Sequence, residues 1–408
     1  MLFIIDGILI NVAIVLTSGV FLSGYIILLG GSDLLVGLLN NSLSWAPVVA
    51  LFSFLIFEKM EKRKAFLLIL LSLSRLLVGS TIFLPLIFGT SAAVLTLLTV
   101  MVILGNMLWG IYSVGQTIWM MSSFPQGIRS EFIYQRIFWL RVAYTLATII
   151  MGYVLDATGK SYTGFLIAFA ASLVLSAANV VTLFRTPEPA NPVQIGKRIG
   201  LKAFLEPLTQ KSFRNYLIFI FLFFLCLTAS TSYTSLYLIR YLQFDYKFIS
   251  TITVISYIFM IVLIKPWNKA AGRIGQKNAC RLAGLFITIE LLIYGFLTRD
   301  TYFILYFAPI FAGIGSSGFY IFILNYRYEL MPDSNRTVFE GWYGAVFGLS
   351  VLLGPALGNQ IMSRLPHIEN AVFQHSQFQL LYLITFVLAA STLPLAMRSQ
   401  KAGGKASP

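Results

Sequence analysis

The sequence predicts an all-α membrane protein with twelve transmembrane helices, arranged as two pseudo-symmetric six-helix bundles. First, hydrophobic residues make up 58% of the chain and charged residues only 11%, whereas about a quarter of the residues of a soluble domain are charged. Second, apolar runs of about 20 residues recur, and each is long enough to cross a hydrocarbon layer of roughly 30 Å. Third, the two halves of the chain repeat the same features in the same order. Helices are the expected spanning element because they satisfy their own backbone hydrogen bonds in lipid.

Hydropathy, turn residues and charges delimit the twelve spans. The first six are predicted near Ile8–Leu29, Leu34–Phe57, Ala65–Phe88, Ala92–Ser122, Phe132–Leu155 and Tyr162–Phe184. The other six are predicted near Tyr216–Ile239, Phe248–Ile264, Ala279–Leu297, Tyr302–Tyr326, Phe339–Met362 and Phe378–Met397.

These spans divide the chain into four parts. A segment between the halves contains four prolines (RTPEPANPVQIGKRIGLKAFLEPLTQKSFR) and must lie outside the bilayer. Part of it has the pattern of a short helix lying on an anionic membrane surface, with an ordinary solvated loop as the alternative. The predicted parts are an N-terminal bundle (1–185), a cytoplasmic linker (186–214), a C-terminal bundle (215–397) and a cytoplasmic tail (398–408).

The basic residues orient the chain. The net charge is +14, but the cations form short clusters between apolar runs, which argues against nucleic-acid binding. Most of the 29 Lys and Arg fall on the side of both termini, and two fall within spans, Arg75 and Arg141. This asymmetry predicts cytoplasmic termini in a multi-pass protein of the inner or plasma membrane.

An internal repeat supports the division into halves. Thr17 in span one and Thr228 in span seven occupy matching places, as do Arg129 and Arg336 after spans four and ten. The separations between matched residues are nearly equal, as expected of duplicated six-helix halves.

Two basic hairpins follow spans two and eight. The first contains Ser53, Glu58, Lys59, Glu61, Lys62 and Arg63, and the second contains Trp267, Gly272, Arg273, Gly275, Gln276 and Lys277. With the twelve spans, these hairpins resemble the signature loops of the major facilitator superfamily, whose pattern is Gly-x-x-x-x-Asp-Arg/Lys-x-Gly-Arg-Arg/Lys. The first copy lacks both glycines and the second lacks the acid.

The resemblance implies that spans one, two, four, five, seven, eight, ten and eleven surround a central substrate cavity. Candidate lining residues are the polar or aromatic groups of these spans, and for each of them packing against a neighbouring helix is the alternative. They are Thr17, Asn41, Trp45, Asn106, Trp109, Tyr112, Gln116, Arg141, Tyr144, Ser230, Tyr233, Tyr237, Tyr257, Phe319, Tyr320 and Trp342.

The resemblance also implies a cytoplasmic gate, in which basic side chains close on carboxylates and helix ends. We expect Glu329, Arg336 and Arg273 to form one ionic cluster, with a purely topological role for these charges as the alternative. The candidate gate residues are Glu58, Lys62, Arg63, Arg129, Gly272, Arg273, Gly275, Glu329 and Arg336.

Neither a coupling carboxylate nor an enzyme site is evident. No acid is predicted at mid-depth of a cavity span, and Asp6 is placed near the inner mouth. Asn106 and Trp109 stand where the family's proton antiporters have Arg and Gln. The sequence shows no metal spacing around its two histidines and no catalytic pair of acids.

The predicted function is secondary active transport of a small organic solute by alternating access of the rocker-switch kind. The alternatives are a proton-coupled drug or metabolite efflux pump, and a transport-inactive receptor or scaffold. The expected partners are a small-molecule substrate and the lipid bilayer, with a coupling proton left open. We expect a monomer that binds no nucleic acid, cofactor or metal.

Overall fold

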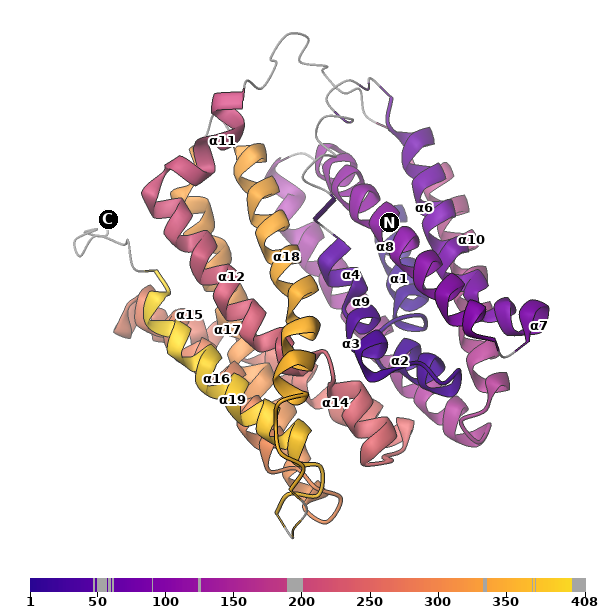
Figure 1. The fold of residues 1–408 in the computed structure, drawn as a ribbon. Coiled ribbons are helices and arrows are strands. Elements are labelled where there is room, and N and C mark those ends of the chain that lie inside the picture. The colour runs from indigo at the N-terminus through magenta and orange to yellow at the C-terminus, as the bar shows by residue number, and fades with distance from the viewer. Residues whose placement is uncertain are drawn as a thin grey trace. The chain divides into compact units, whose positions relative to one another are not determined.

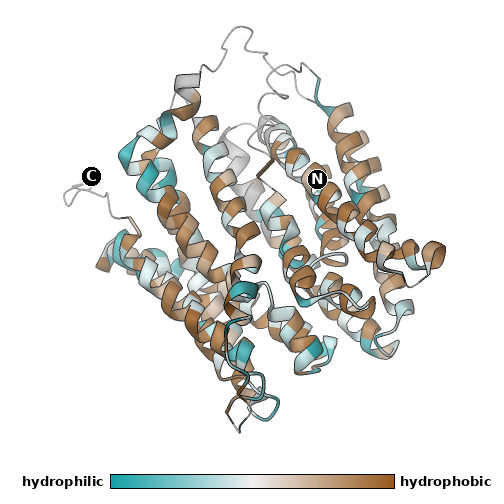
Figure 2. Cartoon of the chain, in the orientation of Figure 1, coloured by the Kyte–Doolittle hydropathy of each residue, from teal (hydrophilic) through white to brown (hydrophobic). Residues whose placement is uncertain are grey.

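The computed structural model describes residues 1–46, 48–49, 57, 60, 62–89, 91–123, 126–188, 201–332, 336–368, 370 and 372–397. Within these ranges the regular structure is helical, and no strand occurs. Hydrophobic residues predominate along the helices, and the hydrophilic ones concentrate toward helix ends and loops (Figure 2). The predicted all-α fold is confirmed.

Eleven of the twelve predicted spans are found in the described part of the chain. Ten helical segments there are long and apolar enough to cross a membrane, and α14 (Tyr246–Val262) with α15 (Ile264–Ile274) forms an eleventh that is bent by 51°. The remaining expected span, the second, falls partly on residues outside the described ones. Its described portion forms α3 (Asp33–Asn40) and α4 (Ser42–Trp45).

The chain divides into two compact units, each composed of helices (Figure 1). Unit 1 comprises Met1–Lys197 and Ser232–Thr251, and unit 2 comprises Arg198–Thr231 and Ile252–Pro408. The other main helices of unit 1 are α1 (Leu2–Val15), α2 (Gly19–Leu28), α6 (Lys64–Ser80), α7 (Leu84–Phe88), α8 (Ala92–Ser122), α9 (Gln126–Ala157), α10 (Tyr162–Phe184) and α13 (Thr234–Leu236). Those of unit 2 are α11 (Leu201–Thr209), α12 (Lys211–Thr231), α16 (Gln276–Gly295), α17 (Ala308–Leu330), α18 (Arg336–Met362) and α19 (Ser376–Thr392).

Both units use the same set of helix pairings. In unit 1, α1 packs against α9 and α10, and α6 packs against α8 and α10. In unit 2, α12 packs against α18 and α19, and α16 packs against α17 and α19. In terms of spans, the first half pairs span one with spans five and six, and span three with spans four and six. The second half repeats this pattern, pairing span seven with spans eleven and twelve, and span nine with spans ten and twelve. The internal repeat in the sequence is therefore also a repeat in packing.

Small residues allow the close approaches within unit 2. A Cβ atom added to Gly315 would lie 2.6 Å from the backbone nitrogen of Ile287 on α16. Cβ atoms at Gly313 and Gly318 would meet α14 and Trp267 of α15. The Gly-x-Gly-x-x-Gly stretch thus serves helix packing, as small residues commonly do in membrane helices.

Spans seven and eight each change units along their length. Helix α12 ends at Thr231, and the segment from Ser232 to Thr251 packs within unit 1. Between α13 and α14 the backbone forms a π-helical turn over Tyr237–Tyr241. Such turns are rare in helices and are frequent at functional sites.

Candidate functional site

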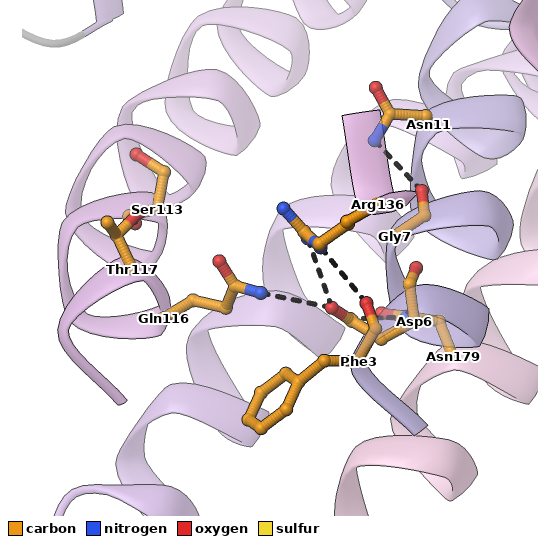
Figure 3. A network of polar contacts seen from close by, with 9 residues as sticks. All are labelled: Phe3, Asp6, Gly7, Asn11, Ser113, Gln116, Thr117, Arg136 and Asn179. Atoms are coloured by element: carbon orange, nitrogen blue, oxygen red, sulfur yellow. Dashed lines mark hydrogen bonds and ion pairs between the residues drawn. The ribbon is translucent and has the colours of Figure 1, made fainter. Parts of the chain in front are cut away.

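A buried carboxylate lies at the centre of a polar cluster in unit 1 (Figure 3). Asp6 on α1 is 0% exposed. Its Oδ2 accepts a hydrogen bond from Gln116 of α8 at 3.0 Å and one from the Arg136 guanidinium of α9 at 3.4 Å. Its Oδ1 accepts from the Asn179 amide of α10 at 2.8 Å. One carboxylate therefore joins four helices.

This cluster explains how an acid is accommodated in an apolar run. An unpaired buried charge is very costly, so it is found with an opposite charge and with hydrogen bonds to its remaining lone pairs. Arg136 supplies the charge and also donates to the carbonyl of Phe3 at 3.0 Å. A Cβ on Gly7 would lie 3.0 Å from the Arg136 Nε, so a glycine at this position leaves room for the guanidinium.

A buried cation, Arg75 of α6, contacts α8 at other residues than the Asp6 cluster does. Arg75 of α6 donates to Asn106 at 3.4 Å and to the hydroxyl of Ser74 at 2.8 Å, and its guanidinium lies 4.9 Å from the centre of the Trp109 ring. Asn106 in turn donates to Ser42 of α4 at 2.7 Å. Arg75 is thus satisfied by neighbouring helices and has no carboxylate partner among the described residues.

Unit 2 has its own arginine and carboxylate cluster. The Arg327 Nε of α17 lies 3.2 Å from Glu340 of α18, an ion-pair distance without the geometry of a hydrogen bond. The guanidinium also lies 3.7 Å from the centre of the Tyr343 ring, which stacks on Tyr216 of α12. The charge is therefore balanced by a partly exposed acid and by an aromatic face.

The clusters of the two units occupy matching places in the repeat. Gln116 and Arg327 are separated by the same number of residues as Thr17 and Thr228. Both clusters include the corresponding three helices, which are α1, α8 and α9 in unit 1 and α12, α17 and α18 in unit 2, and the unit 1 cluster also includes α10. Duplication has preserved the position of a polar cluster while exchanging the residues that form it.

Unit 1 carries another ionic cluster at the helix ends that lie opposite its N-terminus. Asp33, which begins α3, accepts hydrogen bonds from Arg240 and from the Tyr241 hydroxyl. Arg240 also donates to the carbonyl of Gly31 at 2.9 Å. We call Asp33, Arg240 and Tyr241 the Asp33 latch. It joins the start of span two to the end of span seven.

Two further carboxylates secure the start of α14 within the same unit. The Asp156 carboxylate at the end of α9 accepts from the backbone nitrogens of Tyr246 and Lys247, at 3.1 and 2.7 Å. Asp245 pairs with Lys160 at 2.7 Å. A carboxylate at a helix N-terminus satisfies free backbone donors and complements the helix dipole.

Most of the predicted cavity residues in unit 1 have partners within that unit. Asn41 donates to the hydroxyl of Ser232 at 2.6 Å, and Tyr233 packs against Gly37. Thr17 and Trp45 are buried and donate to backbone carbonyls of their own segments, whereas the buried Tyr112 hydroxyl has no hydrogen-bond partner among the described residues. Buried Tyr237 and partly exposed Arg141 and Tyr144 are also in this unit.

The predicted residues of unit 2 are divided between packing and open surface. Phe319 is fully buried among aromatic rings, and Ser230 accepts a hydrogen bond from Thr385. Trp342 donates to the carbonyl of Phe204 on α11 at 2.8 Å. The remaining two, Tyr257 and Tyr320, are partly exposed and exposed, respectively. Their contact with a substrate stays a prediction.

The predicted cytoplasmic gate is only partly described. Glu58 and the side chains of Arg129 and Arg336 lie outside the described residues. Arg63 donates to the carbonyl of Phe57, Lys62 is exposed, and Gly272 and Gly275 flank Arg273 near the end of α15. Glu329 is exposed, and no ion pair joins it to Arg273 in this structure.

Sequence reasoning missed three features of these clusters. It began the first span at Ile8, whereas α1 begins at Leu2 and buries Asp6. It also gave no special role to Arg136 or to Asp33. An acid within an apolar run, matched by polar residues in other spans, is the signal that could have indicated the Asp6 cluster.

Together, the membrane-spanning helices, the duplicated packing and the paired polar clusters define a multi-pass helical membrane protein of duplicated architecture. Comparisons narrow this class. Residues 238–406 match the sequence profile of the Major Facilitator Superfamily. The chain is 30% identical over 135 residues to the class H tetracycline resistance protein of Pasteurella multocida, and the match covers 32% of each chain. The matched segment thus spans about a third of that relative.

Solved structures extend the similarity over nearly the whole chain. The nucleoside transporter NupG has a TM-score of 0.67 at 17% identity, covering 97% of this chain and 98% of that one. The D-xylose-proton symporter has a TM-score of 0.71 at 13% identity, covering 96% and 95%. The chain has the fold of these proteins over nearly its whole length, and with the profile match this confirms the predicted resemblance to the major facilitator superfamily.

Proposed function

We propose that this protein is a secondary active transporter that moves a small organic solute across the inner or plasma membrane by alternating access, with both termini in the cytoplasm. The observation that carries the proposal is the duplication of packing together with a polar cluster on the same three helices of each unit. Helices at these places line the central pathway in the family, and related folds include the nucleoside and D-xylose transporters.

Alternating access assigns a role to the Asp33 latch. With cytoplasmic termini, the latch lies on the external side, where it holds the end of span seven against the start of span two within unit 1. An external opening would separate these contacts, and a cytoplasmic opening would keep them. Partly exposed ion pairs suit this task because they add modest stability and reform readily.

A disulfide across the contact between Asn41 and Ser232 tests the proposal. The two side chains meet at 2.6 Å, so Asn41→Cys with Ser232→Cys should form a bond on oxidation, in a background of Cys226→Ser and Cys280→Ser. Purified protein in liposomes would be screened with nucleosides, pentoses and tetracycline, the chemistries of the similar proteins. Oxidation should abolish uptake of whichever solute is transported, and reduction should restore it.

The control is the Asn41→Cys variant alone, which should be insensitive to the oxidant. Unchanged transport in the fully cross-linked protein would refute alternating access at this end. If the whole panel shows neither transport nor binding, the transport-inactive receptor or scaffold becomes the better account.

Proton coupling is a second candidate, and the Asp6 cluster favours it. A buried carboxylate paired with an arginine has two charge states that differ in their interactions with neighbouring helices, as coupling residues require. Asp6→Asn should then retain exchange of labelled for unlabelled solute while losing accumulation driven by a proton gradient. Full accumulation by this variant would exclude Asp6 from coupling.

A further inference from the structure

Helix α15 carries three cations on one face. Lys265, Lys269 and Arg273 are spaced four residues apart, so each lies one helical turn, about 6 Å, from the next. All three are exposed, and none has a carboxylate partner among the described residues. Like charges at this spacing repel one another, which favours a bound anion.

The three cations line a groove of about 610 Å³ between α15 and the start of α16. The rest of the lining includes Ile274 and Leu282, which are 43% and 40% exposed. A site for a free inorganic anion has no need of exposed apolar side chains. Cations next to exposed aliphatic groups match a molecule with a charged head and a hydrocarbon tail.

The place of the groove in the fold supports the same ligand. Helix α15 bends by 51° from α14 and leads directly into α16, so the groove lies at the junction of spans eight and nine. On the opposite face of α15, Trp267 is buried and donates to the carbonyl of Ile314 at 2.7 Å, which fixes the helix to α17. The basic face is thus directed away from the protein core.

We propose that this groove binds the headgroup of an anionic phospholipid from the cytoplasmic leaflet. Lys265, Lys269 and Arg273 contact the phosphate and the headgroup, and an acyl chain lies against Leu282. The cytoplasmic leaflet is the one rich in anionic lipid, and basic pockets between spans recognise such headgroups. Arg273, which was expected to close a gate with Glu329, is available to the lipid because no ion pair joins these two residues here.

The test is lipid retention by the purified full chain, measured by native mass spectrometry during titration with phosphatidylglycerol or phosphatidylcholine. The wild type should prefer phosphatidylglycerol. The dissociation constant for phosphatidylglycerol should rise by about two orders of magnitude in the triple variant Lys265→Gln, Lys269→Gln and Arg273→Gln. It should rise by about fivefold in Lys269→Gln alone. Replacement of both lysines by Arg should preserve binding.

A matched control removes the same charge elsewhere in unit 2, through Lys211→Gln, Arg214→Gln and Lys277→Gln, none of which lines the groove. It should stay within threefold of the wild type, and phosphatidylcholine retention should be equal in all proteins. An equal loss in the control, an unchanged constant in the triple variant, or displacement of the lipid by millimolar inorganic phosphate would each overturn the proposal. The single Lys269 variant keeps the test decisive if the triple variant does not fold.

Discussion

Asp33→Asn should shift the protein toward states that are open at the Asp33 latch. The substitution keeps the size of the side chain and removes its charge, so the ion pair with Arg240 is lost and the hydrogen bond from the Tyr241 hydroxyl becomes a neutral one. The two side chains are 27% and 30% exposed, which places the pair between surface and buried cases. Surface pairs contribute up to about 1 kcal/mol, and hydrogen bonds to charged groups contribute about 1.5–3 kcal/mol.

A loss of about 1–2 kcal/mol is therefore expected for the latched state. Because about 1.4 kcal/mol corresponds to a factor of ten, the ratio of unlatched to latched protein should rise by roughly 5- to 30-fold. The assay is the labelling rate of Ser232→Cys by a membrane-impermeant maleimide in a background without the two native cysteines. Ser232 is fully buried, so it reacts only when the latch region opens.

The control is Asp300→Asn, which removes a carboxylate bonded to Gln374 in unit 2. It should leave the labelling rate unchanged. High salt should raise the rate of the parent protein and change that of Asp33→Asn less, since screening weakens exposed ion pairs. Equal labelling rates in the parent and Asp33→Asn would refute the role given to the latch.

Three further predictions concern stability. Asp6→Asn and Arg136→Gln should each lower the free energy of unfolding. The double variant should lose less stability than the sum of the two single losses, and a double-mutant cycle should give a coupling energy of about 1–3 kcal/mol. Strictly additive losses would contradict the ion pair. Gly315→Ala should lower Tm by overpacking against α16, at a cost of about 1–3 kcal/mol, whereas Gly272→Ala, which meets no atom within 4 Å, should not. Trp342→Phe should free α11 and speed proteolysis of the linker at unchanged global Tm, and an unchanged cleavage rate would argue against this anchor.

The spans were the most predictable part of the fold. The predicted boundaries Ala92–Ser122 and Tyr162–Phe184 coincide with α8 and α10 because lipid imposes both the length and the composition of a crossing helix. The start of the first span was not predictable in this way. Hydropathy penalises Asp6 as if it faced lipid, whereas the polar partners that offset its cost come from three other spans.

Helix α15 shows the same limit on a second element. The prediction ended span eight at Ile264, where the lysines begin, but the helix continues to Ile274 after a bend. The apolar side of α15 packs through Trp267 against Gly318, and its basic side remains exposed. Hydropathy averaged over a window of residues falls where the lysines begin, and so it indicates the end of the span. The amphipathic helix becomes evident only when residues are grouped by the helical period of about 3.6, which separates the apolar side from the basic side.

The candidate site was predicted by residue type more than by role. Asn106, Trp109, Tyr112 and Gln116 were chosen as polar or aromatic groups of a span expected to line the cavity. In the structure three of them, Asn106, Trp109 and Gln116, meet partners from other helices, and their contact with a substrate stays a prediction. Their partners include the buried charges Arg75 and Asp6, which a linear sequence cannot pair because the contacts link distant spans.

The Asp6 cluster of unit 1 and the Arg327 cluster of unit 2 occupy matching places but are built from different residues, and this difference affects how each could move during transport. In unit 1 the carboxylate is fully buried and its arginine is on α9, whereas in unit 2 the arginine is on α17 and its carboxylate is partly exposed. A buried pair resists separation strongly, since removing one partner leaves an unpaired charge in low dielectric. The unit 2 pair separates at lower cost because the Glu340 side chain is 33% exposed, so water can solvate this acid when it leaves Arg327. During a transport cycle, the contacts that rearrange within a unit should therefore be those around Arg327. The Asp6 cluster should hold α1, α8, α9 and α10 together as one rigid body, unless a proton neutralises the Asp6 carboxylate.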